Sequence, residues 1–94
     1  MQPTIITAHP IRLGFCSVAV ARRARVLTVI YDRDEMEAYA YIETRGPIEI
    51  VGTIQFDTQP TDEPFDGEGW RWVCSTKFAE LNTALHVYCR GEKL

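Results

Sequence analysis

Apolar and polar residues alternate with a period of two along much of this chain, which is the pattern of half-buried β-strands. The clearest case is residues 26–43, VLTVIYDRDEMEAYAYIE. Its first arm is β-branched and aromatic, and the polar residues 32–35 interrupt it before the alternation begins. The alternation puts Met36, Ala38, Ala40 and Ile42 on one face and Tyr39 and Tyr41 on the other. We therefore expect a β-hairpin over 26–43 with its first face in the core.

Further strands are expected before this hairpin. Residues 4–8 predict a short first strand that Pro10 limits. Residues 11–21 predict a central strand, because apolar residues fall on both of its faces. An Ala- and Arg-rich helix over 17–27, capped by Ser17, is the alternative, but the valines and the β-branched residues that follow favour the strand. Residues 22–25 then turn the chain into the hairpin.

Two more strands are expected after the hairpin. Residues 48–56, IEIVGTIQF, alternate and bring Gly52 to the inner face, where glycine suits a bulge. The inner face of this segment consists of Ile48, Ile50, Ile54 and Phe56. Residues 70–74, WRWVC, resume as a strand on which Trp70 and Trp72 share a face.

The C-terminal residues change period. Phe78, Leu81, Leu85 and Tyr88 are spaced i, i+3, i+7 and i+10, which predicts an amphipathic helix that ends near Gly91. A hairpin about Asn82-Thr83 is the alternative for this stretch. The resulting fold class is α+β: one compact domain over 1–94, with an antiparallel sheet of four to five strands and one C-terminal amphipathic helix packed on one face.

Composition narrows the class of protein. Hydrophobic residues make up 46% of the chain and charged residues 24%, as is usual for a globular domain. No apolar run approaches the roughly 20 residues of a membrane helix, and the first residues lack a secretory signal, so we expect no membrane association. Three cysteines without paired spacing predict reduced thiols in a cytoplasmic protein.

Charge is segregated along the chain, although the net charge is only −3. Residues 1–31 contain four arginines and no acid, whereas residues 32–69 contain eleven acids and two arginines. Residues 57–69, DTQPTDEPFDGEG, combine prolines, glycines and acids, which predicts a long loop. Such asymmetry indicates how the protein associates with partners. The alternative interpretation is that a basic strand pairs with an acidic one and their charges cancel locally.

Catalytic and cofactor motifs are missing from the sequence. There is no G-x-S-x-G, no P-loop and no G-x-G-x-x-G, so we expect neither an enzyme nor a nucleotide cofactor. His86 and Cys89, with Cys74, are the best metal candidates, but zinc sites usually show closely spaced pairs such as C-x-x-C. We therefore expect no catalytic residue, no metal and no cofactor, and keep a small metal protein or enzyme as the third hypothesis.

Tyrosine and tryptophan beside an acidic loop favour a protein-binding surface, because such aromatics anchor interfaces. In size, charge and lack of catalytic motifs the chain resembles phage-encoded inhibitors of bacterial defence complexes, such as anti-CRISPR proteins. The leading hypothesis is a small non-enzymatic module that occludes a surface of a larger protein or protein complex, sterically and electrostatically. Alternatively, the exposed aromatic residues form the interface of a homodimer. The residues expected at the contact are Asp62, Glu63, Asp66, Glu68, Trp70, Trp72, Tyr39 and Tyr41.

A compact group of arginines supports the second hypothesis, a small nucleic-acid-binding domain. Arg22, Arg23 and Arg25 would form a cationic turn that contacts phosphates. The acidity of the whole chain disfavours direct binding of nucleic acid and places this hypothesis second.

Overall fold

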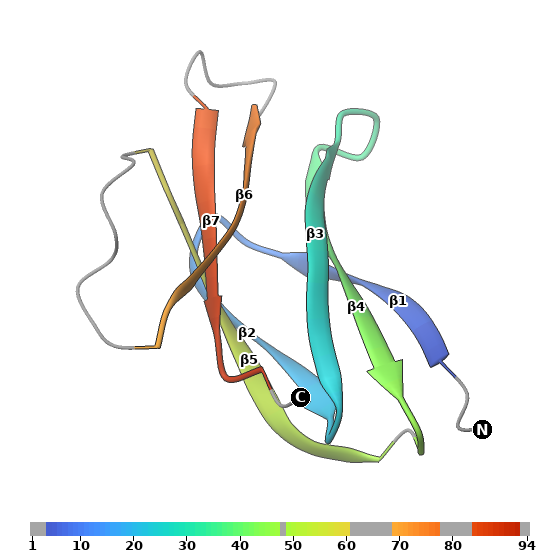
Figure 1. The fold of residues 1–94 in the computed structure, drawn as a ribbon. Helices are drawn as coiled ribbons and strands as arrows, with labels where there is room; N and C mark the ends of the chain where they lie inside the picture. The colour runs from blue at the N-terminus through green and yellow to red at the C-terminus, as the bar shows by residue number, and fades with distance from the viewer. Residues whose placement is uncertain (1–3, 48, 61–68, 78–83, 93–94) are drawn as a thin grey trace.

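The computed structural model describes residues 4–47, 49–60, 69–77 and 84–92, and these form seven strands in two antiparallel sheets (Figure 1). Sheet A has the order β1-β4-β3 and sheet B the order β2-β5-β7-β6. The bounds are β1 Thr4–Ile11, β2 Gly14–Ala21, β3 Ala24–Asp32, β4 Glu37–Arg45, β5 Ile50–Gln59, β6 Arg71–Lys77 and β7 Ala84–Arg90.

The predicted α+β class is wrong, because the described residues contain no helix. Within β7, Leu85, Val87 and Cys89 are buried in the core, so the apolar period is two. Tyr88 is buried as well, on the opposite face, and this second apolar residue produced the false helical spacing. β6 and β7 pair antiparallel, as in the hairpin alternative, but their connection over 78–83 lies outside the described residues.

The central hairpin is confirmed. β3 and β4 pair antiparallel, with Ala38, Ala40 and Ile42 buried and a bulge between Val26 and Thr28. Met36, expected on the same buried face, lies in the turn before β4 and is 64% exposed. At the turn, Asp32 Oδ1 accepts hydrogen bonds from the backbone N–H groups of Asp34 at 2.9 Å and Glu35 at 3.2 Å. This side-chain acceptor stabilises the turn that the polar residues predicted.

Consecutive strands at the N-terminus alternate between the two sheets. Residues 12–13 lead from β1 in sheet A to β2 in sheet B, and residues 22–23 lead back to β3. β2 is a strand rather than a helix, as expected, but it is an edge strand and not a central one. Its apolar residues occupy both faces because one face lies in the core while Phe15 and Ala19 lie outside.

One core fills the space between the sheets. β5 contributes Ile54 and Phe56, whereas Ile50, expected on the same inner face, is largely exposed where the β2–β5 register shifts beside Gly52. Each sheet is therefore covered by the other sheet, in place of the expected helix. The buried core residues are Ile11, Val18, Val20, Ala24, Val26, Val29, Ala38, Ala40, Ile42, Ile54, Phe56, Leu85, Val87 and Cys89.

β3 and β6 lie side by side at the junction of the two sheets and run parallel (Figure 1). Arg71 donates a hydrogen bond to the Val26 carbonyl at 3.1 Å, and Glu92 accepts one from the Val26 N–H at 2.9 Å. Arg71 and Glu92 also form an ion pair at 2.7 Å. We call Arg71 and Glu92 the clamp, because their side chains bond the backbone N–H and carbonyl of Val26 that face away from β4 at the edge of sheet A.

Candidate binding surfaces

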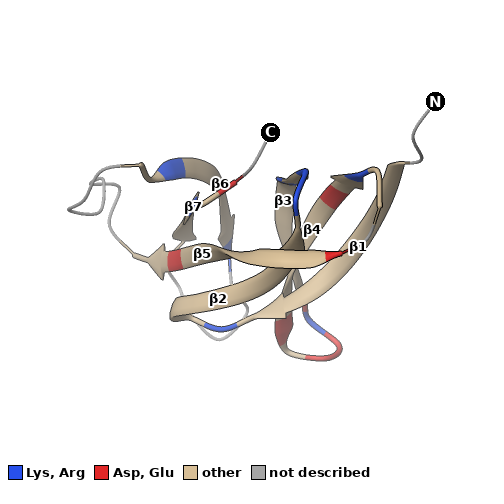
Figure 2. Cartoon of the chain, turned by 90° about the horizontal axis from the view of Figure 1, so that it is seen from below, with Lys and Arg blue, Asp and Glu red and all other residues tan. Residues whose placement is uncertain are grey.

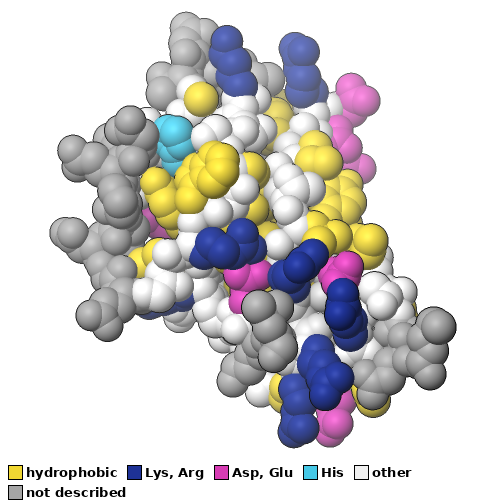
Figure 3. Space-filling view, viewed as in Figure 1, with side chains coloured by type: hydrophobic (Ala, Val, Ile, Leu, Met, Phe, Trp, Pro, Cys, Tyr) yellow, Lys and Arg dark blue, Asp and Glu magenta, His cyan; other side chains and the backbone are white. Residues whose placement is uncertain are grey.

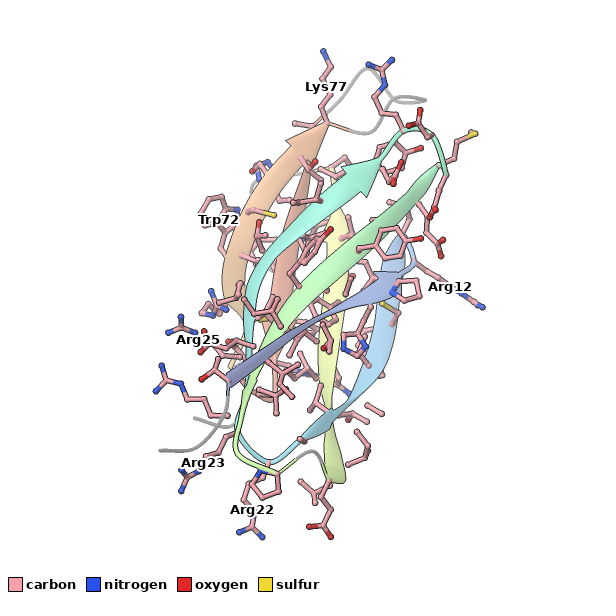
Figure 4. All side chains as sticks on the ribbon, turned by 90° about the vertical axis from the view of Figure 1, so that its right-hand side faces the viewer. Arg12, Arg22, Arg23, Arg25, Trp72 and Lys77 are labelled. Carbon is pink, nitrogen blue, oxygen red and sulfur yellow. The ribbon has the colours of Figure 1, made fainter. Side chains whose placement is uncertain are left out.

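The outer face of sheet B, which points away from sheet A, carries a group of aromatic side chains. The register places Phe15, Asp57, Tyr88 and Trp72 in one row across the four strands. Phe15 and Trp72 lie at the two edges and are 55% and 54% exposed. Figure 4 shows Trp72 projecting outward from β6. We call Phe15, Trp70, Trp72 and Tyr88 the aromatic face.

Trp70 lies across the middle of this face. Its ring meets Phe15 edge-on, with centroids 6.4 Å apart, and the Arg90 guanidinium lies 4.4 Å from the Trp70 ring centroid. Because β5 and β7 separate β2 from β6, the rings of Trp70 and Phe15 must lean over these central strands. Asp57 and Tyr88, which lie between Phe15 and Trp72 in the same row, are buried although they point to the outer face.

The Asp57 carboxylate is unusual in this setting. It is buried, and its Oδ2 has no hydrogen-bond partner among the described residues. Burial raises the pKa of Asp57, while the hydrogen bond from the Thr58 backbone N–H acts in the opposite direction. No sequence motif marked this position, since the carboxylate is distinguished only by its aromatic neighbours in the folded protein.

The predicted partner-binding residues do not form one surface. Tyr39 and Tyr41 lie on the outer face of sheet A, because Ala38, Ala40 and Ile42 alternate with them and are buried. Trp70 and Trp72 therefore lie on the opposite side of the sandwich. The acidic residues Asp62, Glu63, Asp66 and Glu68 lie outside the described residues.

The two ends of the β3–β4 hairpin carry opposite charge (Figure 2). The acidic end consists of Asp32, Asp34, Glu35 and Glu37 in and beside the β3–β4 turn, which also contains Arg33. The arginine end consists of Arg22, Arg23, Arg25 and Arg45, where β2 turns into β3 and β4 ends. The nine residues of β3 separate the two groups by about 30 Å. The segregation along the sequence is thus also a separation in space.

Arg22, Arg23 and Arg45 line a single concavity of about 240 Å³ with Glu49. Figure 4 shows Arg22, Arg23 and Arg25 together at one end of the molecule, and basic side chains gather at this end in Figure 3. Arg45 forms an ion pair with Glu43 at 3.3 Å, so part of the charge is offset locally. Arg45 thus lies beside the predicted cationic turn. The sequence did not indicate this, because Arg45 is about twenty residues away along the chain.

The metal candidates do not converge. His86 points to the outer face of sheet B and hydrogen-bonds Ser75 at 2.7 Å, whereas Cys74 and Cys89 face the core. Burial raises the pKa of Cys89 to about 12, so this thiol is protonated at neutral pH. Among the described residues no group of three metal-ligating side chains comes together.

Comparison of the chain with protein-family models, with curated proteins and with solved structures gives no match. Within the described ranges, no helix has the length and hydropathy that crossing a bilayer requires.

Proposed function

We propose that this protein is a non-enzymatic binding module that occludes a surface of a larger protein through the aromatic face of sheet B. The observation that carries the proposal is the exposure of Phe15 and Trp72 by more than half on the same face that holds Trp70 against Arg90. Trp, Tyr and Arg are the residue types that dominate binding energy at interfaces. An aromatic pair at the rim of a rigid sheet loses little side-chain entropy on binding.

The non-enzymatic part of the proposal is supported by the state of the candidate nucleophile and bases. Cys89 is buried with a raised pKa, and the rings of His86 and His9 are hydrogen-bonded to Ser75 and Thr7, respectively. Each of these pairs places a hydroxyl beside an imidazole, but among the described residues neither imidazole is hydrogen-bonded to a carboxylate that would orient it as a base. In the proposal, the negative charge of the acidic residues over 62–68 speeds association with a basic partner.

The test is capture of partners from a nuclease-treated bacterial lysate with tagged wild-type protein and two variants. Phe15→Ala/Trp72→Ala removes the exposed aromatics, and Ile30→Ala is the matched control, because Ile30 is 51% exposed on sheet A. A protein retained stoichiometrically by the wild type and by Ile30→Ala, but not by the aromatic variant, supports the proposal. Equal retention by all three proteins contradicts it.

Affinity for the captured protein then gives the magnitude. Truncation of an anchoring tryptophan such as Trp72 costs about 2 kcal/mol of binding free energy, which is a roughly 30-fold loss of affinity. Charge reversal of Asp62, Glu63, Asp66 and Glu68 should slow association without changing the dissociation rate to the same extent. An unchanged association rate would remove the electrostatic part of the mechanism.

Binding of nucleic acid at the arginine end is the second candidate, favoured by the concavity that Arg22, Arg23 and Arg45 share. It predicts retention on single-stranded DNA that falls steeply with salt. Arg22→Ala/Arg25→Ala should reduce this retention, whereas Arg12→Ala, on the β1–β2 connection, should not. Retention that survives high salt, or that responds equally to both variants, argues against this candidate.

A further inference from the structure

The outer face of sheet A, which points away from sheet B, is a second exposed surface. In Figure 4 its three strands lie in front of sheet B, and no other described element covers them. The register of β1, β4 and β3 arranges the outward side chains in rows across the strands. The two middle rows carry no charge and consist of Ala8, Tyr41 and Thr28, and of Pro10, Tyr39 and Ile30.

Apolar side chains dominate the middle of this face. Ile30 is 51% exposed, and Ile6, which lies opposite Glu43 in the next row, is 58% exposed. Ala8 and Pro10 are exposed beside them on β1. We call the two middle rows together with Ile6 the apolar band. An apolar patch between charged residues is typical of a surface that meets another protein.

The charges at the two ends of the apolar band are opposite (Figure 2). At the acidic end, the Tyr39 hydroxyl donates hydrogen bonds to the carboxylates of Glu35 and Glu37, which holds both acids at the outer face of sheet A. At the arginine end, Arg25 lies directly opposite Glu43, and Arg45 forms its ion pair with the same carboxylate. Because two guanidinium groups share one carboxylate, this end keeps a positive charge.

This face is complementary to a reversed copy of itself. The outward residues of β4 are, in order, Glu37, Tyr39, Tyr41, Glu43 and Arg45, so Tyr41 is at their centre. A two-fold axis that lies in the interface and crosses β4 at Tyr41 turns a second copy end for end. Glu37 of each copy then faces Arg45 of the other, and the two apolar bands meet. Sheets pack face to face in this way about 10 Å apart, and two-fold dimers are the commonest oligomers.

We infer that the outer face of sheet A is the interface of a symmetric homodimer in which the two β4 strands lie antiparallel. The apolar bands supply the contact area, and the charged ends fix the orientation, because like charges would meet if the second copy were not reversed. The aromatic face of sheet B points away from this interface. The inference is therefore independent of the proposed protein-binding function.

The size of the face sets the strength of the dimer. Three adjacent strands of eight or nine residues make a surface of roughly 30 Å by 15 Å, so the dimer buries about 900 Å² in all. Interfaces below about 1,200 Å² belong to weak, reversible complexes, and we expect a Kd of about 10–100 µM.

The test is sedimentation equilibrium of the full chain at loading concentrations from about 5 µM to about 500 µM, which bracket the expected Kd. We expect a reversible equilibrium between monomer and dimer. A monomer over the whole range, or assemblies that keep growing beyond the dimer, would overturn the inference, because a two-fold interface closes with two copies.

Charge reversal tests the pairing of unlike ends. Arg25→Glu/Arg45→Glu makes both ends acidic, Glu35→Lys/Glu37→Lys makes both ends more basic, and all four positions are exposed. Each variant alone should dimerise at least about tenfold more weakly than the wild type, because like charges meet. An equimolar mixture of the two variants restores unlike pairs and should form a heterodimer within about threefold of the wild-type affinity. Variants that dimerise as the wild type does, or a mixture that stays monomeric, contradict the inference.

Two further variants distinguish the faces of the sandwich. Ile30→Lys places a charge in the apolar band and should also weaken the dimer about tenfold. Trp72→Ala, on the aromatic face of sheet B, is the matched control and should leave the monomer–dimer equilibrium unchanged. The opposite result would place the dimer interface on sheet B and overturn the inference, whereas the capture experiment with the aromatic variant tests the proposed function separately.

Discussion

Asp57 shows how one side chain can make stability depend on pH. Burial raises its pKa above the ordinary carboxyl value of 3.8, so the folded protein binds this proton more tightly than the unfolded chain does. The free energy of unfolding therefore falls as pH rises from 3.8 through the raised pKa, and stays lower above it. A neutral side chain of the same shape would remove this loss.

The first prediction is that Asp57→Asn stabilises the protein at pH 7. We expect a gain of about 1 kcal/mol in unfolding free energy, because a buried amide costs less than a buried carboxylate without a full set of partners. The gain should shrink as pH falls toward 3.8. Urea unfolding over a pH series measures it, and a gain that is independent of pH would contradict the assignment.

The clamp is the second feature at this scale. Burial acts to raise the pKa of Glu92, but hydrogen bonds from Arg71 and from the Val26 N–H outweigh it, so the pKa of Glu92 is lowered. A lowered carboxyl pKa stabilises the fold above its unfolded-state value, and this contribution is lost as pH falls through the folded-state value.

We predict that Glu92→Ala lowers the unfolding free energy by about 1–2 kcal/mol at pH 7, because Arg71 and the Val26 N–H lose their acceptor. Glu43→Ala is the control, since its partner Arg45 has a side chain that is 65% exposed, and it should cost about 0.5 kcal/mol or less. Denaturant titrations of both variants measure the difference. Equal losses would show that the clamp contributes no more than a surface ion pair.

Among the strands, the sequence predicted most of the positions and missed the layers. Alternation correctly identified the β3–β4 hairpin and most of β5 and β6, because period two is a property of each strand alone. The expected ends were wrong in two places, since β1 continues through Pro10 and β5 continues through residues 57–59 of the expected loop. Tyr39 and Trp72 were correctly predicted to face outward. Alternation could not assign strands to sheets, however, so the two residues were wrongly expected on one surface. At β7 an apolar side chain, Tyr88, is buried on the outer face of sheet B, and this hid the period of two and predicted a helix.

The binding surfaces were less predictable than the strands for the same reason. Trp72 and Arg22 were recognisable as exposed aromatic and basic residues. The cavity of about 410 Å³ between the ends of the two sheets is lined by residues 11–13, 31, 35–38 and 58, and no spacing along the chain links these segments. Asp57 resembled the other acids of a loop because nothing local showed that it lies in a row between Phe15 and Tyr88.

The residue after β7 offers the third prediction. Gly91 has φ = 94°, and a Cβ there would lie 2.9 Å from the Thr53 carbonyl oxygen. Gly14 has φ = 82°, but a Cβ added there would meet nothing within 4 Å, so it is the matched control. We expect Gly91→Ala to cost about 2–3 kcal/mol and Gly14→Ala about 1 kcal/mol, by thermal or urea unfolding. Equal costs would mean that the backbone near Thr53 yields easily.

For the whole molecule, the sandwich is closed on one side and open on the other. The clamp covers the junction of β3 and β6, whereas β1 and β2 meet at their connection and form no ladder with each other in the described structure. A small apolar cleft lies between them, lined by residues that include Ile5, Val20 and Ile50. Local opening should therefore start on this side.

The fourth prediction follows for amide hydrogen exchange. Ladder-bonded amides of β4, β5 and β7, each flanked by two strands, should exchange at least about tenfold more slowly than those of β1 and β2. Exchange followed by NMR at neutral pH measures the difference. Protection in β1 equal to that in β4 would show that the open side is as stable as the interior of the sheets.

The clamp also has a consequence for folding kinetics. Its hydrogen bonds join Val26 to residues 45 and 66 positions away, so they form only when both sheets are in place. Contacts that form after the rate-limiting step alter unfolding alone. We therefore predict that Glu92→Ala speeds unfolding roughly tenfold at a destabilisation of about 1.4 kcal/mol, with little change in the folding rate. A chevron plot whose folding limb slows instead would place the docking of β6 on β3 inside the folding nucleus.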